Sequence, residues 1–517
     1  MFLALLMNCL ESPIIAVVLL LITVIVFRVR SFLWNYIRMC YYASKLPGPP
    51  AYPIIGNGAL FLGTIEETTK NLLSLGEQYR NSSLVRAWIG PLPIFAALDP
   101  KIVQEVLTNP NALEKPYLMK FIWNNVMEKS ILTSEVPEWK HNRSFIIKAF
   151  SPVIIKSYFK IFVEKTNILT KKLDLELNKN KSFDIFEYLS RTTLDSVCES
   201  TMGVNMNSYN ESYYLDAIES ALSLAFVRIF NVFKHPNIFY KFTRDYKTIS
   251  KNRSIIQKFV GKIIDDKRKN YVTSVDNLDD VRAINKNLYK KSFLEYLMDF
   301  TKNNTNFTDE QLRNETNTII FGAFETSANA LSYVLLNLAA HKDIQTKVYN
   351  EILEVLGENN GDSINFDDLP KLKYMEMVIK ESMRRYSTAP FIARQAYQDI
   401  KIGNYTIPKG ISIAIPLFTI HLNANHWKNP LKFDPERFTP ENIKNRHPYA
   451  YIPFSGGPRN CIGIRYAWIV MKTTLATLLS RYEFHTDLNL DELRFQFNVS
   501  LTLVNGHQVR ITSRQKL

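Results

Sequence analysis

Apolar residues recur at every third or fourth position between about residues 100 and 390, which predicts a largely helical region. The longest regular run extends from Ile319 to about His341. Thr308 and Gln311 precede it with the spacing of a capping box, so the helix is expected to begin there. At 1.5 Å per residue, such a helix would be roughly 50 Å long and would cross a whole domain.

Segments that favour β structure lie on both sides of this helical region. Two short strands are predicted before it, and a strand-rich stretch with two turns follows it. A last hairpin is predicted where Asn505-Gly506 suits a type I′ turn. These predictions cover residues 84–88, 94–98, 400–415 with turns at Gly403-Asn404 and Lys409-Gly410, and 501–506. The chain is therefore expected to be mainly α with a minor β region drawn from both ends.

The N-terminal region has the pattern of a membrane signal-anchor. Pro13 to Phe27 is uncharged and almost wholly apolar, and flanking residues extend it toward the about 20 residues that a bilayer requires. Basic residues follow this stretch and none precedes it, so a single-pass topology with a cytoplasmic catalytic domain is expected. We therefore divide the chain into an anchor with its basic flank (1–45), a stiff proline-rich hinge (46–53) and one catalytic domain (54–517).

Composition and charge narrow the possible functions. The four cysteines, Cys9, Cys40, Cys198 and Cys461, suggest no disulfide framework and no zinc or iron–sulfur cluster, which fits a reducing compartment. The net charge is +14, but no nucleic-acid motif accompanies it. We therefore expect no nucleic-acid binding and instead an acidic protein partner and an anionic membrane surface.

The segment from Pro453 to Gly463 places Cys461 in a glycine-rich loop directly ahead of an apolar helix. A helix N-terminus favours a thiolate, and glycines allow tight turns and the close approach of a flat ligand. Arg459 is placed to meet an anionic group on that ligand. These are the features that a haem with one thiolate ligand requires. A buried core cysteine is the alternative, whereas a phosphate loop would need Lys-Ser/Thr where Ile464-Arg465 stands.

The same segment resembles the haem-binding loop of the cytochrome P450 monooxygenases, F-x-x-G-x-R-x-C-x-G, at every fixed position. The resemblance implies non-covalent haem b (iron-protoporphyrin IX), with Cys461 as the axial iron ligand and Phe454, Arg459 and Gly463 beside the cofactor. In typical members of the similar family-four clan, a glutamate three residues before the central-helix acid esterifies the haem. Gly322 stands at that position, so no covalent link of this kind is expected.

The middle of the long predicted helix contains Gly322-Ala323-Phe324-Glu325-Thr326-Ser327. An acid beside a threonine in mid-helix could simply mark a polar face, but the segment resembles the oxygen-activating motif [AG]-G-x-[DE]-T-[TS] of cytochromes P450. That resemblance implies that Thr326 binds the activated oxygen by a hydrogen bond and that Glu325 relays protons to it. Ala323 replaces the second glycine of the motif.

Three further motifs occur in family order and extend the resemblance over essentially the whole chain beyond the anchor. Trp139 and Arg143 match W-x-x-x-R, and Arg394 matches another position that binds haem propionates. Glu381 and Arg384 form E-x-x-R, which resembles a family network completed by the arginine of P-E-R-F, here Arg437. This network is implied to brace the loop that carries the cysteine.

The resemblance implies a cytochrome P450 fold with an N-terminal transmembrane helix and a microsomal monooxygenase similar to family-four insect members. It would insert one oxygen atom from O₂ into a lipophilic substrate such as a fatty acid, odorant, hormone or xenobiotic. Electrons would come from NADPH through cytochrome P450 reductase at the endoplasmic reticulum, with cytochrome b5 as a second donor. A P450-fold isomerase or dehydratase of lipid peroxides and a non-catalytic haem or lipid carrier are the alternatives.

Two surfaces follow from this hypothesis. The partner would dock on cations near the haem, while the apolar segment from Leu222 to Tyr240 would form either a substrate entrance that dips into the membrane or ordinary core. The candidate docking cations are Lys140, Lys148, Arg446, Arg459 and Arg465. Arg459 is expected to be committed to haem, and solvated surface cations are the alternative reading for any one of them.

Overall fold

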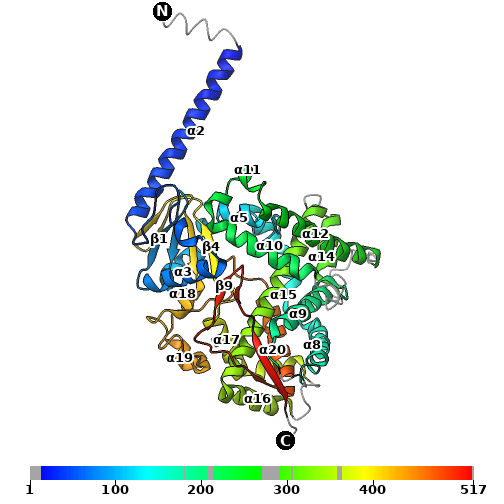
Figure 1. Cartoon of the computed structure of the whole chain (residues 1–517). Helices are drawn as coiled ribbons and strands as arrows, with labels where there is room; N and C mark the ends of the chain where they lie inside the picture. Colours follow the sequence, from blue (N-terminus) through cyan, green and yellow to red (C-terminus); the bar gives the residue numbers. More distant parts are fainter. Residues whose placement is uncertain are drawn as a thin grey trace, which may run out of the picture.

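The computed structural model describes residues 13–177, 179, 181–206, 213–270, 291–303, 307–357 and 364–514, and most of these are helical (Figure 1). The helices are α2 (Pro13–Ser44), α3 (Ile65–Gln78), α4 (Pro100–Thr108), α5 (Tyr117–Trp123), α6 (Val136–Ile146), α7 (Pro152–Ser157), α8 (Phe159–Leu173), α9 (Ile185–Met202), α10 (Tyr213–Phe230), α11 (Asn237–Tyr240), α12 (Arg244–Asn270), α14 (Phe293–Asn303), α15 (Asp309–Ala340), α16 (Lys342–Leu356), α17 (Lys373–Arg385), α18 (Leu417–Leu422), α19 (Pro440–Lys444) and α20 (Ile464–Arg481).

The helix α15 is the central element, as its length predicted. It begins after Thr308, whose side chain and that of Gln311 form the predicted capping box. Nearly all of its side chains from Leu312 to Ala339 are buried, because α9, α12, α17 and α20 pack around it. The helix therefore lies at the centre of the fold, and other helices pack against it from several sides.

The predicted strands before and after the helical region meet in one sheet with the order β1-β2-β7-β4. The strand β2 pairs with β1 in an antiparallel and with β7 in a parallel register, so segments more than 300 residues apart become neighbours. The strands are β1 (Leu84–Ile89), β2 (Leu92–Ala97), β3 (Phe183–Asp184), β4 (Phe391–Gln395), β5 (Ile400–Ile402), β6 (Tyr405–Ile407), β7 (Ser412–Pro416), β8 (Tyr482–His485), β9 (Phe495–Phe497), β10 (Leu501–Leu503) and β11 (Gln508–Ser513).

The predicted hairpin at Asn505-Gly506 is wrong. The strand β10 pairs backwards with β9, whereas β11 pairs with β3 and β8. Of the two turn residues only Gly506 has a positive φ, so the turn is not type I′. Asp184 accepts a hydrogen bond from the backbone N–H of His507 (2.9 Å), which draws the chain after the turn toward the start of α9.

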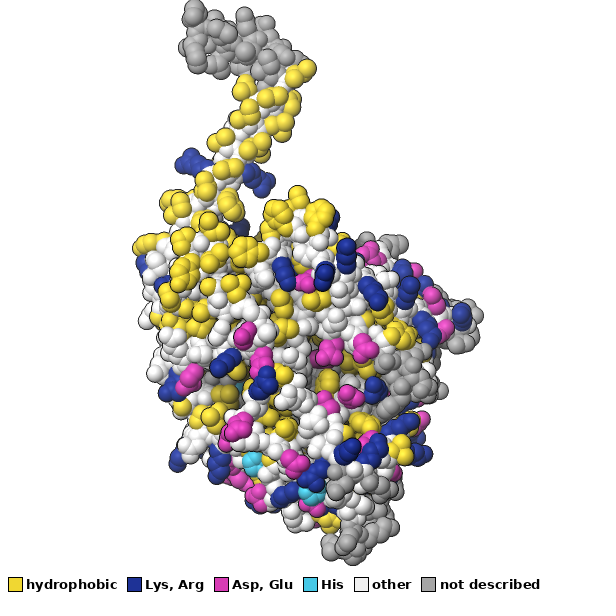
Figure 2. All heavy atoms as spheres, in the orientation of Figure 1, with side chains coloured by type: hydrophobic (Ala, Val, Ile, Leu, Met, Phe, Trp, Pro, Cys, Tyr) yellow, Lys and Arg dark blue, Asp and Glu magenta, His cyan; other side chains and the backbone are white. Residues whose placement is uncertain are grey.

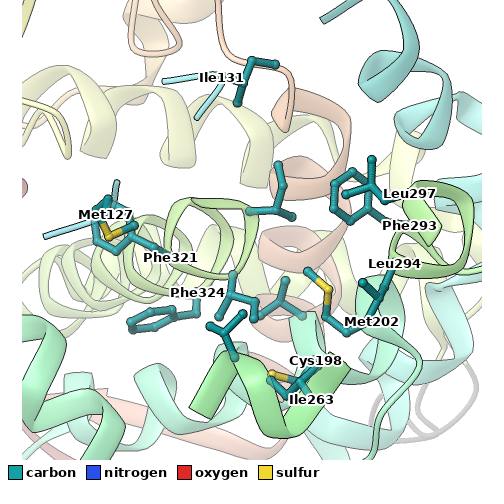
Figure 3. Packing of buried hydrophobic residues seen from close by; sticks show 14 of the residues in the cluster. Met127, Ile131, Cys198, Met202, Ile263, Phe293, Leu294, Leu297, Phe321 and Phe324 are labelled. Carbon is teal, nitrogen blue, oxygen red and sulfur yellow. The ribbon is translucent and has the colours of Figure 1, made fainter. Parts of the chain in front are cut away.

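Three apolar clusters form the core. The first lies between α9, α12, α14 and α15, and Figure 3 shows part of it, including Phe321 and Phe324 of α15 near Met127, with Cys198 and Met202 of α9. The second surrounds the C-terminal half of α15 together with α16, α17 and α20. The third lies beneath the four-stranded sheet. The first two clusters therefore hold α15 along its whole length.

The predicted N-terminal helix is present as α2, and its exposed apolar residues project away from the globular body (Figures 1 and 2). Its last turns are fastened to the sheet region: Tyr36 Oη donates to the Pro91 carbonyl (3.0 Å), Arg38 pairs with Asp399, and Ala43 is fully buried. Residues 1–12 of the predicted anchor segment lie outside the described residues. The observed helix thus combines an unpacked apolar part with a docked part.

The proline-rich segment 46–53 is also bound to the domain. The backbone N–H of Arg86 in β1 donates to the Pro47 carbonyl (2.8 Å), and the Arg86 side chain donates to Leu46 (3.0 Å) and Pro49 (3.3 Å). A Cβ on Gly48 would lie 2.1 Å from the Arg86 carbonyl oxygen, so only glycine allows this close approach. The predicted hinge therefore packs as an extension of the sheet.

Candidate active site

The cysteine loop is held by its own backbone. The backbone N–H of Cys461 donates to the Phe454 carbonyl (3.0 Å), and α20 begins immediately after its N-cap residue Gly463. Gly457 has a φ of +69°, and a Cβ there would lie 2.0 Å from the Leu107 carbonyl oxygen. Gly456 likewise faces the Tyr449 ring. Gly456 and Gly457 therefore allow the loop to pack closely against the rest of the chain, and of the three glycines only Gly463 borders the sulfur. This partly corrects the prediction that the glycines make room for a flat ligand.

The Cys461 thiol faces an internal space. Its side chain is exposed, yet the surrounding protein raises its pKa by burial. The Gly463 N–H and the Arg143 charge act in the opposite direction and lower the pKa, but their effect is smaller. The helix N-terminus thus acts on the pKa in the predicted direction, and burial opposes it. A bound cation at the sulfur is needed to reverse this balance.

The central segment of α15 is open where the rest of the helix is buried. Gly322 is exposed in the middle of an otherwise buried helix, and a Cβ there would meet nothing within 4 Å. Ala323 on this segment and Ile462 beside the cysteine both pack against the first apolar cluster. The two motifs, 139 residues apart in sequence, therefore contact the same apolar cluster.

Thr326 and Glu325 differ in their surroundings. The Thr326 hydroxyl donates to the Gly322 carbonyl of its own helix (2.7 Å). Glu325 accepts a hydrogen bond from the Ser500 hydroxyl, and its other carboxylate oxygen is buried without a hydrogen-bond partner. Burial raises the pKa of Glu325 to about 7, the Ser500 bond lowers it, and the Glu219 charge raises it further. Glu325 is therefore an acid that can exchange a proton near neutral pH.

Positive charges converge on one edge of the site. Arg394 on β4 and Arg459 in the cysteine loop are both buried, and burial lowers the pKa of each to about 10. The Arg394 Nε and the Arg459 Nε and Nη1 have no hydrogen-bond partner. Lys115 joins them: burial and the two arginines hold its pKa well below the usual range. Among the described residues none of the three makes an ion pair, although the Glu114 charge acts on Arg459. This edge therefore suits an anionic ligand.

Sequence reasoning missed Lys115. No motif marks it, because its position beside the arginines results from the packing of the loop before α5 against β4. The only available signal was the dipeptide Lys115-Pro116, since a proline commonly begins a helix and leaves the preceding residue extended.

Trp139 and Arg143 of α6 lie one helical turn apart, as predicted. The Arg459 guanidinium stacks over the buried Trp139 ring at 4.3 Å. Arg143 donates to the carbonyl (2.9 Å) and the side chain (2.6 Å) of Asn460. Arg143 thus holds Asn460, the residue next to Cys461, while the Trp139 ring supports Arg459.

Glu315 is a second residue that the sequence did not reveal. It is buried on α15 and accepts hydrogen bonds from the Ile131 N–H (2.9 and 3.0 Å) and the Asn142 amide (3.3 Å), and burial raises its pKa to about 8. Three residues beyond Ile131, the Ser134 carbonyl accepts a bond from Arg459 (2.8 Å). Glu315 therefore ties the central helix to the loop that positions Arg459.

The predicted network of Glu381, Arg384 and Arg437 is assembled. The fully buried Glu381 binds Arg384 through both oxygens (2.7 and 2.8 Å) and Arg437 Nε through one (3.3 Å). Arg384 also donates to the His421 carbonyl (2.9 Å). The His421 ring accepts a bond from the Ile452 N–H (3.0 Å), which connects the network to the start of the cysteine loop.

Of the predicted docking cations, three are exposed and two are partly or wholly buried. Lys140, Lys148 and Arg465 are exposed. Arg446 is half-buried with its guanidinium 3.9 Å from the Trp427 ring and donates to the Arg437 carbonyl (2.8 Å). Arg459 is buried at the anionic edge, as expected. Arg446 is thus a structural residue, which corrects its assignment to the docking surface.

An apolar cavity of about 470 Å³ opens between the sheet, α5 and α10. Its walls include Trp88, Trp123, Phe226 and Phe391, and Met39 of α2 also lines it. The segment 222–240 is divided: Phe226, Ile229 and Phe230 line this cavity, whereas other residues of the segment are exposed. The exposed members are Phe233, Ile238 and Phe239.

Taken together, the site fits a haem. The Cys461 side chain is open beside Gly463, and the Gly322–Thr326 segment is the open part of a mostly buried helix. Arg394, Arg459 and Lys115 are buried without an ion pair among the described residues. These features match a flat apolar macrocycle with one axial thiolate and two propionate groups.

Comparison with known proteins agrees with this geometry. Residues 46–509 match the family model described as cytochrome P450. The chain is 32% identical to cytochrome P450 4c21 of Blattella germanica over 91% of this chain and 94% of that protein. It is 31% identical to cytochrome P450 4V2 of Homo sapiens over 90% of this chain and 89% of that protein. Its fold matches the crystal structure of the cytochrome P450DA heme domain with a TM-score of 0.75 at 23% identity, covering 91% of this chain and 98% of that one.

Proposed function

The chain belongs to the cytochrome P450 family and is a monooxygenase with non-covalent haem b, and we propose that it is membrane-bound and oxidises a lipophilic substrate with electrons from an NADPH-dependent reductase. The observation that carries the proposal is the pairing of a single inward-facing Cys461 with a buried cluster of cations that have no acidic partner among the described residues.

The residues around the haem have separable roles in this proposal. When bound, haem activates O₂ with two electrons and two protons, and one oxygen atom enters the substrate. The Cys461 sulfur would be the iron ligand, and Arg394, Arg459 and Lys115 would bind the propionates. Trp139 and Arg143 support this set, because Trp139 stacks beneath Arg459 and Arg143 holds Asn460.

Glu325 and Thr326 supply and hold protons on the α15 side of the site. The pKa of about 7 lets Glu325 both take up and release a proton near neutral pH. The free carboxylate oxygen is the atom that would pass the proton on. The Thr326 hydroxyl, now bonded to the Gly322 carbonyl, would donate its hydrogen bond into the site on the exposed side of the helix.

The substrate is expected to be an elongated apolar molecule. Aromatic and aliphatic side chains form nearly the whole wall of the 470 Å³ cavity, and burial of apolar surface contributes about 25 cal/mol per Å². Arg86 is the one charged residue in this wall, and its guanidinium already binds two carbonyl oxygens of the segment 46–53. The cavity therefore selects by shape and apolarity.

The electron-donating partner would approach the surface that carries Lys140, Lys148 and Arg465. These side chains are exposed on α6, just after it, and at the start of α20 beside the cysteine loop. They suit an acidic flavoprotein such as the reductase of the endoplasmic reticulum, or cytochrome b5.

Membrane attachment is supported by α2 and by its position beside the cavity. Arg28 and Arg30 follow the uncharged apolar stretch of α2, which favours a cytoplasmic body. Because Met39 of this helix lines the cavity, a lipophilic substrate could enter the cavity beside the membrane helix. The endoplasmic reticulum membrane is proposed from the family membership.

The test is turnover of the membrane-bound protein with reductase, NADPH and isotopically labelled O₂, with fatty acids and lipophilic plant and insect metabolites as substrates. Labelled product, detected by mass spectrometry, is expected. Rearrangement of lipid hydroperoxides without reductase and without label would instead support an isomerase. Absence of both reactions, in protein with a normal thiolate carbon monoxide spectrum, would contradict the proposal and leave a carrier role.

A further inference from the structure

The four-stranded sheet contributes a regular wall to the apolar cavity. On β7 the alternate residues Ser412, Ala414 and Pro416 line the cavity, because successive side chains of a strand point to opposite faces of the sheet. Small side chains occupy the middle of this face, since Ala414 is paired with Ala96 on β2 and with Ala393 on β4. These three alanines form a smooth apolar floor on which an extended chain can lie.

One end of this floor lies toward α15. The Phe391 ring at the start of β4 lies 5.3 Å from that of Phe497, at the end of β9. Val499, in the turn that follows β9, also lines the cavity, and the adjacent Ser500 donates a hydrogen bond to Glu325 of α15. This inner end is therefore next to the segment of α15 that carries the proton donor.

The other end of the floor carries a polar pair. Gln395 and Ser412 lie directly opposite each other on β4 and β7, and both line the cavity. Because Phe391 and Gln395 are the two ends of β4, the pair is about 13 Å from the inner end. Gln395 Nε2 donates to the Gly410 carbonyl (2.9 Å), and a Cβ on Gly410 would lie 3.8 Å from the Met39 sulfur of α2. The polar pair is thus at the outer end, beside the N-terminal helix.

This pair has unused hydrogen-bonding capacity. The bond to Gly410 fixes the Gln395 amide, so that its Oε1 remains as an acceptor. Among the described residues neither this oxygen nor the Ser412 hydroxyl has a hydrogen-bond partner, and both side chains are partly exposed. The unpartnered oxygens of Thr419 and Asn498, which also belong to wall residues, are buried instead. Gln395 and Ser412 therefore offer one acceptor and one hydroxyl to a ligand.

The charge of the wall favours a neutral head group. The guanidinium of Arg86, the one charged residue in the wall, donates to the carbonyls of Leu46 and Pro49. A carboxylate at the polar pair would meet no free cation of the wall, and its oxygens would repel the Gln395 oxygen. A hydroxyl group, in contrast, can donate to Gln395 Oε1 and accept from the Ser412 hydroxyl at the same time.

We propose that Gln395 and Ser412 bind the hydroxyl group of an apolar alcohol substrate, whose chain extends over the alanine floor toward Phe391. This rests on the oxidation of a lipophilic substrate proposed above, and it names the head group and the direction in which the molecule lies. Because the hydroxyl is held at the outer end, oxygen enters the part of the chain that is remote from it.

The experiment titrates the full haem-loaded chain in nanodiscs with dodecanol, dodecyl methyl ether and dodecanoate, and reads the dissociation constants from the haem absorption spectrum. The native chain should bind the alcohol about tenfold more tightly than the ether, since the ether leaves the Gln395 oxygen without a donor. The variant Gln395→Leu/Ser412→Ala should reduce this ratio to about one. Comparison of the ratio between variants cancels the partition of each compound into lipid.

The matched control is Thr419→Val, which removes the buried hydroxyl of the same wall and should keep the ratio. A carbon monoxide spectrum verifies that each variant is folded around haem. Equal binding of alcohol and ether by the native chain would overturn the proposal, as would tighter binding of dodecanoate, survival of the ratio in the double variant or its loss in the control. Binding that depends on the hydroxyl but leads to no labelled product would support this site and count against the proposed oxidation. Absence of a spectral change with all three compounds would overturn the lipophilic substrate itself, and this site with it.

Discussion

Glu325 shows how the environment of one side chain sets its chemistry. Its carboxylate is enclosed on α15, bonded by Ser500 and influenced by the Glu219 charge, with no cation nearby to hold it ionised. The pKa is therefore raised from the usual range to about 7. A proton donor with this pKa is active below it and loses activity as the pH rises through it.

Replacing Ser500 should shift this titration. The Ser500 hydroxyl lowers the pKa of Glu325, so Ser500→Ala should raise that pKa and move the alkaline fall in turnover to higher pH. The pH dependence of kcat measures the shift. Ser332→Ala is the control, because that buried hydroxyl on the same helix donates only to the Ala328 carbonyl (2.8 Å). An unchanged profile in Ser500→Ala would remove Glu325 from the proton pathway.

Lys115→Met should have opposite effects on the two forms of the protein. Without haem, the buried lysine lies against two arginines and costs stability, so the variant apoprotein should unfold at a higher temperature. With haem, a propionate partner is lost, and haem should leave about tenfold faster. Transfer of haem to apomyoglobin measures the second effect, and exposed Lys101→Met is the control. Slower or unchanged haem loss would contradict the assignment.

The network around Glu381 connects several secondary-structure elements. It joins α17 to the segment 428–438 and, through His421, to the cysteine loop. Isolated ion pairs on helices contribute only a few tenths of a kcal/mol. Here both arginines are buried and their remaining N–H groups are bonded to carbonyl oxygens, so the three elements hold one geometry together.

Glu381→Ala should therefore yield poorly folded protein without haem. The substitution leaves Arg384 and Arg437 buried without an acid, which costs about 3–5 kcal/mol. Haem content per chain and the thermal unfolding midpoint measure the outcome, and the exposed Glu354→Ala on α16 should be neutral. Recovery of Glu381→Ala with a full complement of haem would refute the bracing role.

At the scale of the whole molecule, α2 is continuous from its exposed apolar part to its docked last turns. A membrane-spanning helix fixed in this way would set the orientation of the body, and with it the cavity that Met39 lines. The Arg38–Asp399 pair is partly exposed and contributes about 1 kcal/mol or less. The packing of Met39 and Ala43 therefore dominates the docking.

Ala43→Arg should release the last turns of α2 from the sheet. Ala43 is fully buried, and a long charged side chain has no space there. Hydrogen exchange of residues 35–44 should accelerate by about tenfold or more, while Asp399→Ala should change it little. Equal protection in both variants would mean that the body holds α2 by contacts other than this packing.

The sequence alone predicted those parts of the site that are encoded over short distances. Cys461 with Arg459 and Gly463, the Glu325-Thr326 pair, Trp139 with Arg143, and Glu381 with Arg384 each lie within a few residues, so each set could be matched to a short family motif. Helical periodicity and the capping box similarly predicted α15, because helix formation is governed by neighbouring residues.

Tertiary packing decided what depends on residues far apart in the chain. Lys115, Glu315 and Ser500 gain their roles only when loops and strands meet α15 and β4, and no local pattern distinguishes them from ordinary polar residues. The pairing of β11 with β3 overrode a favourable Asn-Gly turn, since long-range hydrogen bonds and burial outweigh local turn preference. Burial also decided the pKa of Cys461 and Glu325, because the cost of enclosing a charge exists only in the folded protein.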